Sequence, residues 1–481
     1  MRTRSPGIKL LFTILIAGFL AVPLAMVYAL VYDRQDQAQT AQQSINSGWG
    51  GEQVIAGPVL VVPFTTTEMV TVEQDGKAIT RSDRVERSLY ISPQSNAVES
   101  DIKPQERRIS IYRSVLFEAT VKGKATFALP ADLTRFGIER DSLIWNRAEV
   151  RVGVSDARGL TRGGTITANG QNLEIQPGKG PAATNSEGFF AFAPWDGEGT
   201  LAVDYSYGLR GSRILSLVPR GGTTSWSVTS PWPNPSFAGS FLPETREVSD
   251  QGFSAKYTID KLALGQPPVS RTDYTFPQDL PDNDTLRSMS SYAYNTSDAY
   301  AGEDTGASSR SVSVGLVEPV NLYSKVDRAV KYGFLFIGFT FLAYLLFDIV
   351  GGARVAVAEY LLTGAGLILF FVLLLAFAEV IGFTAAYILA SASIIGLLTA
   401  YSAAVLGSWK RARFMGILLV GLYALLFVLL NLDAWSLLIG SVLLFVALAG
   451  VMYATRKIDW SSVGRRPDDD EAETAGETAP V

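Results

Sequence analysis

The residue types that most often carry catalysis are missing from this sequence. Its 481 residues include no cysteine and no histidine. Thiolate nucleophiles, histidine general bases, and zinc or haem held by imidazole are therefore excluded for this chain. Carboxylates, tyrosines, lysines and serine–lysine pairs remain as groups that could do chemistry.

Two arrangements of these groups resemble catalytic pairs. Ser100 and Lys103 have the S-x-x-K spacing of serine acylases, which place both residues on one turn of a buried helix. Here the pair lies in a polar stretch followed by Pro104, and we interpret the spacing as coincidence. Asp156 and Asp204 could act as acid and base, but Asp156 opens a turn, where aspartate is common. We therefore predict no catalytic residue, no metal, no cofactor and no enzymatic activity.

Four carboxylates lie beside the most apolar parts of the chain, where an ionisable group would be functional by default. Each falls within a turn or two of the end of an uncharged run. They are Asp348, Glu359, Glu379 and Asp433. There a carboxylate can reach water or pair with Arg354, whereas a proton relay needs ionisable groups at successive depths. These positions indicate interfacial acids.

Six uncharged runs define the elements that position these residues. The first covers residues 10–32. At about 1.5 Å per residue it spans a hydrocarbon core of roughly 30 Å. It is also longer than the apolar region of a signal peptide, which indicates an uncleaved anchor that tolerates Pro23. The five later runs are residues 332–347, 360–378, 380–409, 414–432 and 434–455. They predict a bundle of five more transmembrane helices.

The distribution of lysine and arginine sets the orientation of the helices. Basic residues cluster in segment 2–9, loop 410–413 and the stretch after 455, whereas loops 378–383 and 431–433 have none. Because basic loops stay in the cytoplasm, we predict that both termini are cytoplasmic. The long segment between the first two helices is then periplasmic.

That segment reads as a β-rich, sandwich-like domain of mostly antiparallel strands. Polar residues 33–46 should continue the first helix, and residues 278–305 favour a loop. Short β-branched runs separated by turn residues indicate the strands. They are residues 54–64, 70–72, 108–117, 148–154, 165–168, 201–207, 224–229 and 311–317.

The predicted domain organisation has four parts. Residues 1–32 form the cytoplasmic N-terminus and anchor helix, and residues 33–326 form the periplasmic domain inserted between helices one and two. Residues 327–457 form the five-helix bundle, and residues 458–481 form an acidic, disordered cytoplasmic tail.

Several strings in this arrangement resemble the CreD family of inner-membrane, cell-envelope integrity proteins. They lie at residues 49–63, 231–243, 251–253, 326–341 and 455–460. Two family strings with histidine appear here without it: only Val357-Ala358-Glu359-Tyr360 stands before the third helix, and loop 378–383 reads Ala-Glu-Val-Ile-Gly-Phe. Roles of those family histidines cannot apply to this chain.

The resemblance implies a bacterial inner-membrane protein tied to envelope stress, colicin tolerance and β-lactam response. Within the shared strings we select candidate interaction or structural residues: Trp49, Gln53, Gly57, Pro58, Trp232, Pro233, Pro235, Phe237, Asp327, Arg328, Lys331 and Tyr332. The Trp-Pro run is either a rigid loop against the β core or a partner-binding surface. The charged junction around Asp327 is expected to hold the outer domain over the bundle through charge pairs and headgroup contacts.

The leading interpretation is therefore a non-enzymatic protein that supports envelope integrity and the envelope-stress response through its periplasmic domain. Expected partners are the lipid bilayer and envelope proteins or cell-wall components, with no nucleic acid. The alternative is a transporter or lipid-handling protein that uses the five-helix bundle. The sequence gives no indication of oligomeric state.

Overall fold

The structure is a computed structural model, and it describes residues 6–74, 77–109, 112–273, 310–317, 322–349, 355–431 and 436–456. The chain divides into two compact units. The helical unit consists of residues 1–38 and 320–481, and the β unit consists of residues 39–319. The boundary at 38/39 lies six residues after the expected 32/33, because the first helix continues beyond residue 32. The boundary at 319/320 lies seven residues before the expected 326/327, because the next helix of the unit already begins at Leu322.

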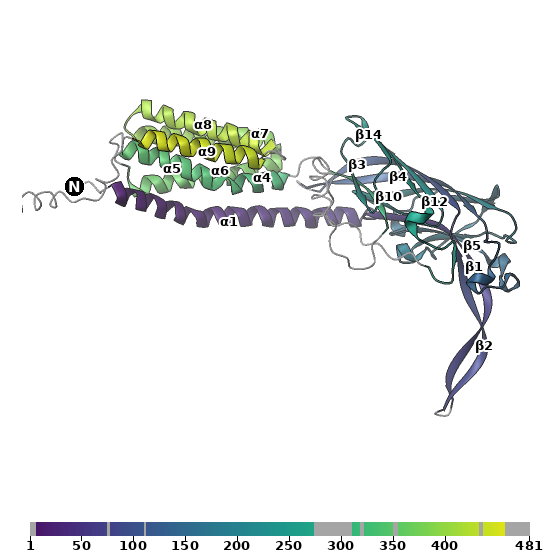
Figure 1. The fold of residues 1–481 in the computed structure, drawn as a ribbon. Coiled ribbons are helices and arrows are strands. Elements are labelled where there is room, and N and C mark those ends of the chain that lie inside the picture. The colour runs from purple at the N-terminus through teal and green to yellow at the C-terminus, as the bar shows by residue number, and fades with distance from the viewer. Residues whose placement is uncertain are drawn as a thin grey trace, which may run out of the picture. The chain divides into compact units, whose positions relative to one another are not determined.

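Long helices make up the helical unit (Figure 1). They are α1 (Pro6–Ser47), α4 (Leu322–Lys331), α5 (Gly333–Ile349), α6 (Val357–Ile381), α7 (Phe383–Val405), α8 (Trp409–Asn431) and α9 (Ser436–Thr455). The polar residues 33–46 do continue the first helix, and Pro23 lies inside it. The junction before the second predicted span is a separate amphipathic helix, α4, which the sequence analysis did not anticipate.

Five helical stretches in the described part of the chain are long and apolar enough to cross a membrane. They are Leu10–Ser47, Leu322–Asp348, Val357–Ile381, Phe383–Val405 and Trp409–Asn431. The sixth predicted span coincides with α9, which is helical but is not one of these five. The chain is therefore a membrane protein with several apolar helices and a large β-rich unit.

The β unit contains two sheets. Its strands are β1 (Gln53–Gln74), β2 (Lys77–Ile91), β3 (Ser95–Ile109), β4 (Tyr112–Phe127), β5 (Glu149–Val154), β6 (Thr165–Ala168), β7 (Gln171–Leu173), β8 (Ile175–Pro177), β9 (Gly188–Phe192), β10 (Leu201–Ser212), β11 (Ile214–Val218), β12 (Thr223–Ser230), β13 (Pro235–Gly239), β14 (Thr245–Ser249), β15 (Gly252–Ile259), β16 (Val269–Ser270) and β17 (Val312–Leu316). A short helix, α2 (Lys261–Leu264), and five 3-10 turns lie between strands.

The nine-stranded sheet has the order β13-β17-β11-β1-β5-β9-β8, with β2 beside β1 and β16 beside β2. The eight-stranded sheet has the order β14-β15-β12-β3-β4-β10-β6-β7. Both sheets are mixed, because β1 runs parallel to β11 and β3 runs parallel to β12. The expectation of antiparallel pairing is thus wrong for these two pairs, which join strands far apart in the sequence.

The main hydrophobic core of the described residues contains side chains from both sheets. Leu60 and Phe64 from the first sheet belong to the same buried cluster as Phe117 and Trp226 from the second. Strand β10 illustrates why side chains from both sheets meet there. Its residues alternate between buried and more exposed positions along most of the strand. One face of each strand therefore packs inward, as in a sandwich.

Most predicted strands coincide with observed ones, with one instructive failure. Residues 108–117 were expected to form one strand, but β3 ends at Ile109 and β4 begins at Tyr112, with these two residues paired opposite each other. The two strands are antiparallel, so the chain changes direction between them. The β-branched and aromatic residues of this stretch favour one continuous strand by sequence alone. The expected loop at 278–305 lies outside the described residues.

Candidate functional site

The turn that joins α1 to β1 holds the first candidate residue, Trp49. The guanidinium carbons of Arg107 and Arg210 lie 5.0 Å and 4.6 Å from the centre of its indole ring. Arg210 also donates to Glu118 at 3.1 Å. Two cations over one ring hold the indole in place against β3 and β10. Trp49 therefore fixes the start of the β unit.

The end of α1 is bound to the same region. The hydroxyl of Ser114 donates to the side-chain oxygen of Asn46 at 2.6 Å. The side-chain amide of Gln42 donates to the carbonyl of Arg113 at 2.8 Å. The helix thus enters the β unit and is held against β4 by side-chain hydrogen bonds.

Gln53, the second candidate, is completely buried. Its amide nitrogen donates to the carbonyl of Gly50 at 2.5 Å and approaches the carbonyl of Asp156 at 3.4 Å. Its amide oxygen lies 3.3 Å from the hydroxyl of Ser155, which donates to it. The neutral amide of Gln53 thus links the turn before β1 to the two residues that follow β5. Because the side chain is completely buried, it is not exposed to a binding partner.

Gly57 and Pro58 form a cis peptide bond at an irregularity in the pairing of β1 with β5. Gly57 has a φ of +92°, which disfavours any residue with a side chain. Its carbonyl accepts a hydrogen bond from Asn96 at 3.0 Å, and Asn96 in turn accepts from the hydroxyl of Tyr205 at 3.0 Å. Burial raises the pKa of the Tyr205 phenol. This buried chain joins the two sheets.

The Trp-Pro loop packs inward. The indole nitrogen of Trp232 donates to the carbonyl of Val317 at 3.0 Å, and Val317 donates from its backbone to Asn234 at 3.2 Å. Both Trp232 and Phe237 pack against the core, and Phe237 meets Phe253 edge to face at 5.8 Å. These contacts favour the rigid-loop interpretation.

The two prolines of the loop lead into β13. Pro233 precedes the strand, and Pro235 opens it opposite Leu316 of β17. Strand β13 lies at the edge of its sheet, a position where proline is tolerated because one side of the strand needs no backbone donor. The loop therefore ties β13 and β17 together.

The charged junction residues lie on α4 and contact the helical unit. Lys331 pairs with Asp327 at 2.7 Å, one turn away, and its ammonium lies 5.8 Å from the centre of the Tyr28 ring on α1. Arg328 approaches the carbonyl of Leu430 on α8 at 3.5 Å. Tyr332 follows α4 directly and separates it from α5.

Two further contacts bind α4 to neighbouring helices. Tyr323 donates to Glu379 at the end of α6 at 3.2 Å, and Lys325 donates to Asn431 at the end of α8 at 3.0 Å. The ammonium of Lys325 also lies 5.1 Å from the centre of the Phe383 ring on α7. The described contacts of α4 therefore fasten it to the ends of α6, α7 and α8 and to the middle of α1.

The carboxylates of the helical unit lie at helix ends as expected, but they differ in exposure. Glu359 accepts from the backbone nitrogen of Ala356 at 2.6 Å and so caps the start of α6. Asp348, near the end of α5, is only 5 % exposed, which disfavours the solvated alternative, while Arg354, its expected partner, lies outside the described residues. Asp433 lies outside the described residues.

The two pairs that resembled catalytic motifs do not form catalytic geometry. Ser100 is buried on β3, where its hydroxyl accepts from the indole of Trp226 at 3.0 Å, and Lys103 is exposed on the same strand. Residues three apart on a strand point to opposite faces. Asp156 is held by Arg158 at 2.6 Å, and this hydrogen bond lowers the pKa of Asp156. Asp204 is exposed on β10, opposite Lys124.

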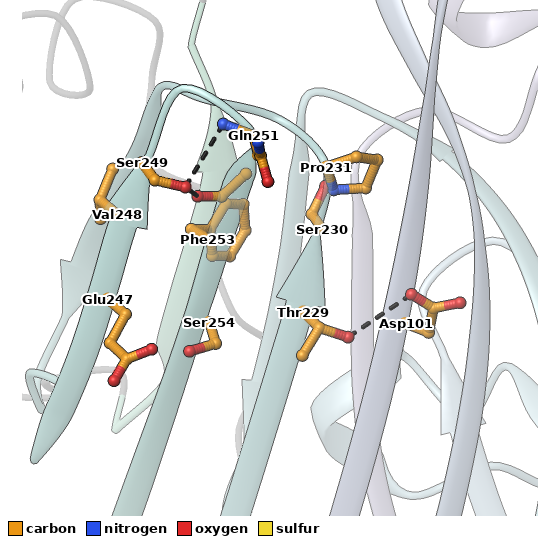
Figure 2. Close-up of a pocket in the computed structure, with 11 residues that line it drawn as sticks. Asp101, Thr229, Ser230, Pro231, Glu247, Val248, Ser249, Gln251, Phe253 and Ser254 are labelled. Carbon is orange, nitrogen blue, oxygen red and sulfur yellow. Dashed lines mark hydrogen bonds between the residues drawn. The ribbon is translucent and has the colours of Figure 1, made fainter.

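A polar trough lies where β12, β14 and β15 meet (Figure 2). It has a volume of about 500 Å³. On one side of the trough, Thr229 of β12 donates to Asp101 of the neighbouring strand β3 at 3.4 Å. Glu247 and Gln251 line the other side. Sequence reasoning missed this feature, because its polar residues lie on four strands, β3, β12, β14 and β15, that are brought together only by the sheet order. Its hydroxyls and carboxylates could bind a polar ligand, but none of the candidate residues belongs to it.

Comparisons with known proteins point to one family. The model of the family "Inner membrane protein CreD" matches residues 5–461. The inner membrane protein CreD of Escherichia coli (strain K12) is 31 % identical over 451 residues, which cover 92 % of this chain and 90 % of that protein.

One solved structure, a mutant M1 zinc metallopeptidase from Deinococcus radiodurans bound to a peptide substrate, covers 34 % of this chain and 38 % of its own. Its sequence identity is 12 % and its TM-score is 0.22, so this likeness carries no argument about fold or function. The long family match and the identity to the E. coli protein are decisive: this chain belongs to the CreD family of inner membrane proteins.

Proposed function

We propose that this chain is a non-enzymatic inner-membrane protein that supports cell-envelope integrity and the envelope-stress response. In this proposal the β unit lies in the periplasm and contacts envelope proteins or cell-wall components. The helical unit anchors it, with both termini in the cytoplasm. The bilayer is the second partner.

The observation that carries the proposal is the filling of the helical interior by aromatic rings. Phe370 of α6 lies 4.6 Å from Tyr423 of α8 and 5.5 Å from Tyr387 of α7, between ring centres. Phe336 of α5 meets Tyr423 at 5.0 Å. All four rings are at least 96 % buried. Close-packed rings at the meeting point of four helices suit an anchor better than a polar path for a substrate.

Three buried hydroxyls in the same unit, those of Tyr344, Tyr387 and Ser402, make hydrogen bonds. The hydroxyls of Tyr344 and Ser402 lie 2.5 Å apart, and Ser402 also donates to the carbonyl of Leu398 at 2.6 Å. Tyr387 donates to the carbonyl of Tyr423 at 2.6 Å. These bonds join α5 to α7 and α7 to α8, which again favours a stable anchor.

One observation favours the alternative, a transporter or lipid-handling protein. Asp348 is a carboxylate buried in the helical unit, and such residues often mark ion or substrate paths. The same experiment therefore tests both functions.

Neutralising the helical carboxylates is expected to leave envelope function intact. Glu359→Gln keeps the helix cap and Glu379→Gln keeps an acceptor for Tyr323, because an amide oxygen also accepts hydrogen bonds. Asp348→Asn removes only the charge. The measurement is survival of a strain lacking the natural gene under a β-lactam or another envelope stress, at matched expression of each variant. Loss of survival with Asp348→Asn in a normally folded protein would contradict the anchor proposal and place the function in the bundle.

The orientation is expected to show in cysteine labelling, since the chain has no cysteine of its own. In intact spheroplasts, an impermeant maleimide should label Asp433→Cys and leave Lys410→Cys unlabelled. The reason is the asymmetry of basic residues between these loops. Both positions should react after the membrane is permeabilised, which is the control. Labelling at 410 but not at 433 would reverse the proposed topology.

A further inference from the structure

Much of the β1–β2 ribbon has no flanking strand among the residues that the structure describes. The two strands pair without interruption from Leu60 opposite Ile91 to Gln74 opposite Lys77. Flanking strands end early, because β5 reaches only Val61 on β1 and β16 reaches only Tyr90 on β2. Figure 1 shows the rest of the ribbon extending beyond the sheets of the β unit.

The last backbone bridge from β1 to a described residue outside β2 joins Phe64 to Leu143. Beyond it, residues 65–74 of β1 have a strand partner on one side only among the residues that the structure describes. At about 3.4 Å per residue this part is roughly 34 Å long. Alternate residues direct their backbone N–H and C=O groups outward, and such an edge is a template for another strand.

The two edges differ in how well their charges discourage pairing. The β2 edge carries dense charges of both signs: Arg81, Asp83, Arg84, Glu86 and Arg87. The β1 edge reads Thr-Thr-Thr-Glu-Met-Val-Thr-Val-Glu-Gln, with no proline, lysine or arginine. Its Glu68 is already paired with Arg87 of the same ribbon at 2.7 Å, and Met69 is 78 % exposed. The β1 edge therefore lacks the usual protection against pairing.

We propose that the free β1 edge pairs antiparallel with the β1 edge of a second copy of this chain. A two-fold axis sets each strand against itself, so the strand must be self-complementary. An axis at Met69 would place Glu68 opposite residue 70 and Thr67 opposite residue 71, with no two acids facing each other. Rows of threonine and valine form favourable cross-strand pairs.

The membrane supplies the second argument for another copy as the occupant. Copies inserted in one membrane share one orientation, so a two-fold axis that relates them runs along the membrane normal. Confinement to the same membrane also raises the local concentration at which two β1 edges meet. Ten residues per strand bury less than the roughly 1,200 Å² of a stable soluble interface. Pairing should therefore be weak and should depend on the local concentration that the membrane provides.

Single cysteines in the full chain, reconstituted into liposomes, test this pairing. The β1 variants are Thr65→Cys, Thr67→Cys and Met69→Cys. Their matched controls are Glu86→Cys, Arg84→Cys and Ser82→Cys, which lie directly opposite on β2 at the same heights along the ribbon. Disulfide formation requires Cβ atoms about 4 Å apart, so oxidation should give dimer at one β1 position at least about tenfold faster than at any β2 position.

A blocking charge provides the second variant. Thr67→Lys, combined with the most reactive β1 cysteine other than position 67, should reduce the dimer to background because a charge on the edge opposes pairing. Ser82→Lys on β2 should leave the dimer unchanged. Equal crosslinking at β1 and β2, or no effect of Thr67→Lys, would show random collision and overturn the proposal. In native membranes, β1 cysteines that crosslink to other proteins without self-crosslinking would also overturn it.

Discussion

Replacing Trp232 by alanine is expected to lower the free energy of unfolding of the β unit by about 3 kcal/mol. Two losses add up. The ring leaves a hole beside the core, and the carbonyl of Val317 loses the indole donor at 3.0 Å. Val317 follows directly after β17, so the change also weakens the attachment of that strand. Pulse proteolysis of the full chain in detergent across a denaturant series measures the effect.

Trp232→Phe is the matched control for the two losses. It keeps most of the apolar volume and removes only the donor, so it should cost about 1 kcal/mol. If Trp232→Ala leaves stability unchanged but abolishes envelope function, the loop is a partner-binding surface after all. Equal stability losses for the two variants would mean that the hydrogen bond, and not the packing, holds the loop.

The sequence predicted the membrane helices well because lipid imposes a strong local rule. Soluble domains seldom need an uncharged run of about 20 residues, whereas a helix that crosses a bilayer requires one. Helices α6, α7 and α8 accordingly lie close to the predicted spans. Helix α4 escaped prediction because its charged residues interrupt the apolar signal. In the structure these polar residues contact other helices: Tyr323 and Lys325 bond to the ends of α6 and α8, and Lys331 lies over the Tyr28 ring of α1.

The β unit was less predictable because its pairing is not local. Strand β1 lies between β5 and β11, and it is parallel to β11, which follows about 160 residues later. No short pattern encodes such a pairing. Strand β2, rich in arginine and serine, was missed because much of it forms the ribbon and has no buried face to create an alternating pattern.

The contacts of the candidate residues could be read only from the structure. Trp49 and Trp232 are both tryptophans beside glycine or proline. One lies under two arginines, whereas the other donates to a backbone carbonyl. The same residue type therefore makes cation–π contacts at one position and a hydrogen bond at the other. The partners in both cases come from segments that are distant in the sequence.

Gln53→Glu is expected to produce the second large effect, a loss of at least about 3 kcal/mol at pH 7. The substitution changes almost no volume, but it places a carboxylate at a completely buried position. There the Gln53 amide nitrogen now faces the carbonyl oxygens of Gly50 and Asp156. A carboxylate oxygen in its place repels both carbonyls, so the group must either stay protonated or remain charged without compensation.

This cost should depend on pH with a definite sign. Burial raises the folded-state pKa of the introduced carboxyl above its unfolded value of about 4.3. The unfolded state then releases a proton that the folded state keeps. The free energy of unfolding should therefore fall by about 1.4 kcal/mol per pH unit above pH 4.3, until the folded-state pKa is reached. Stability curves at pH 4, 5.5 and 7, relative to the unmodified chain, measure this slope.

Gln53→Leu separates charge from lost hydrogen bonds. It removes the donor and the acceptor and introduces no titrating group, so it should cost about 1–3 kcal/mol at every pH. A pH-independent loss for Gln53→Glu, equal to that of Gln53→Leu, would mean that water reaches the position and that the amide is not the closed link seen in the structure. A slope for Gln53→Glu alone would establish that the turn between α1 and β1 is dry. Gln53 would then link the turn before β1 to the residues that follow β5 through a buried polar contact.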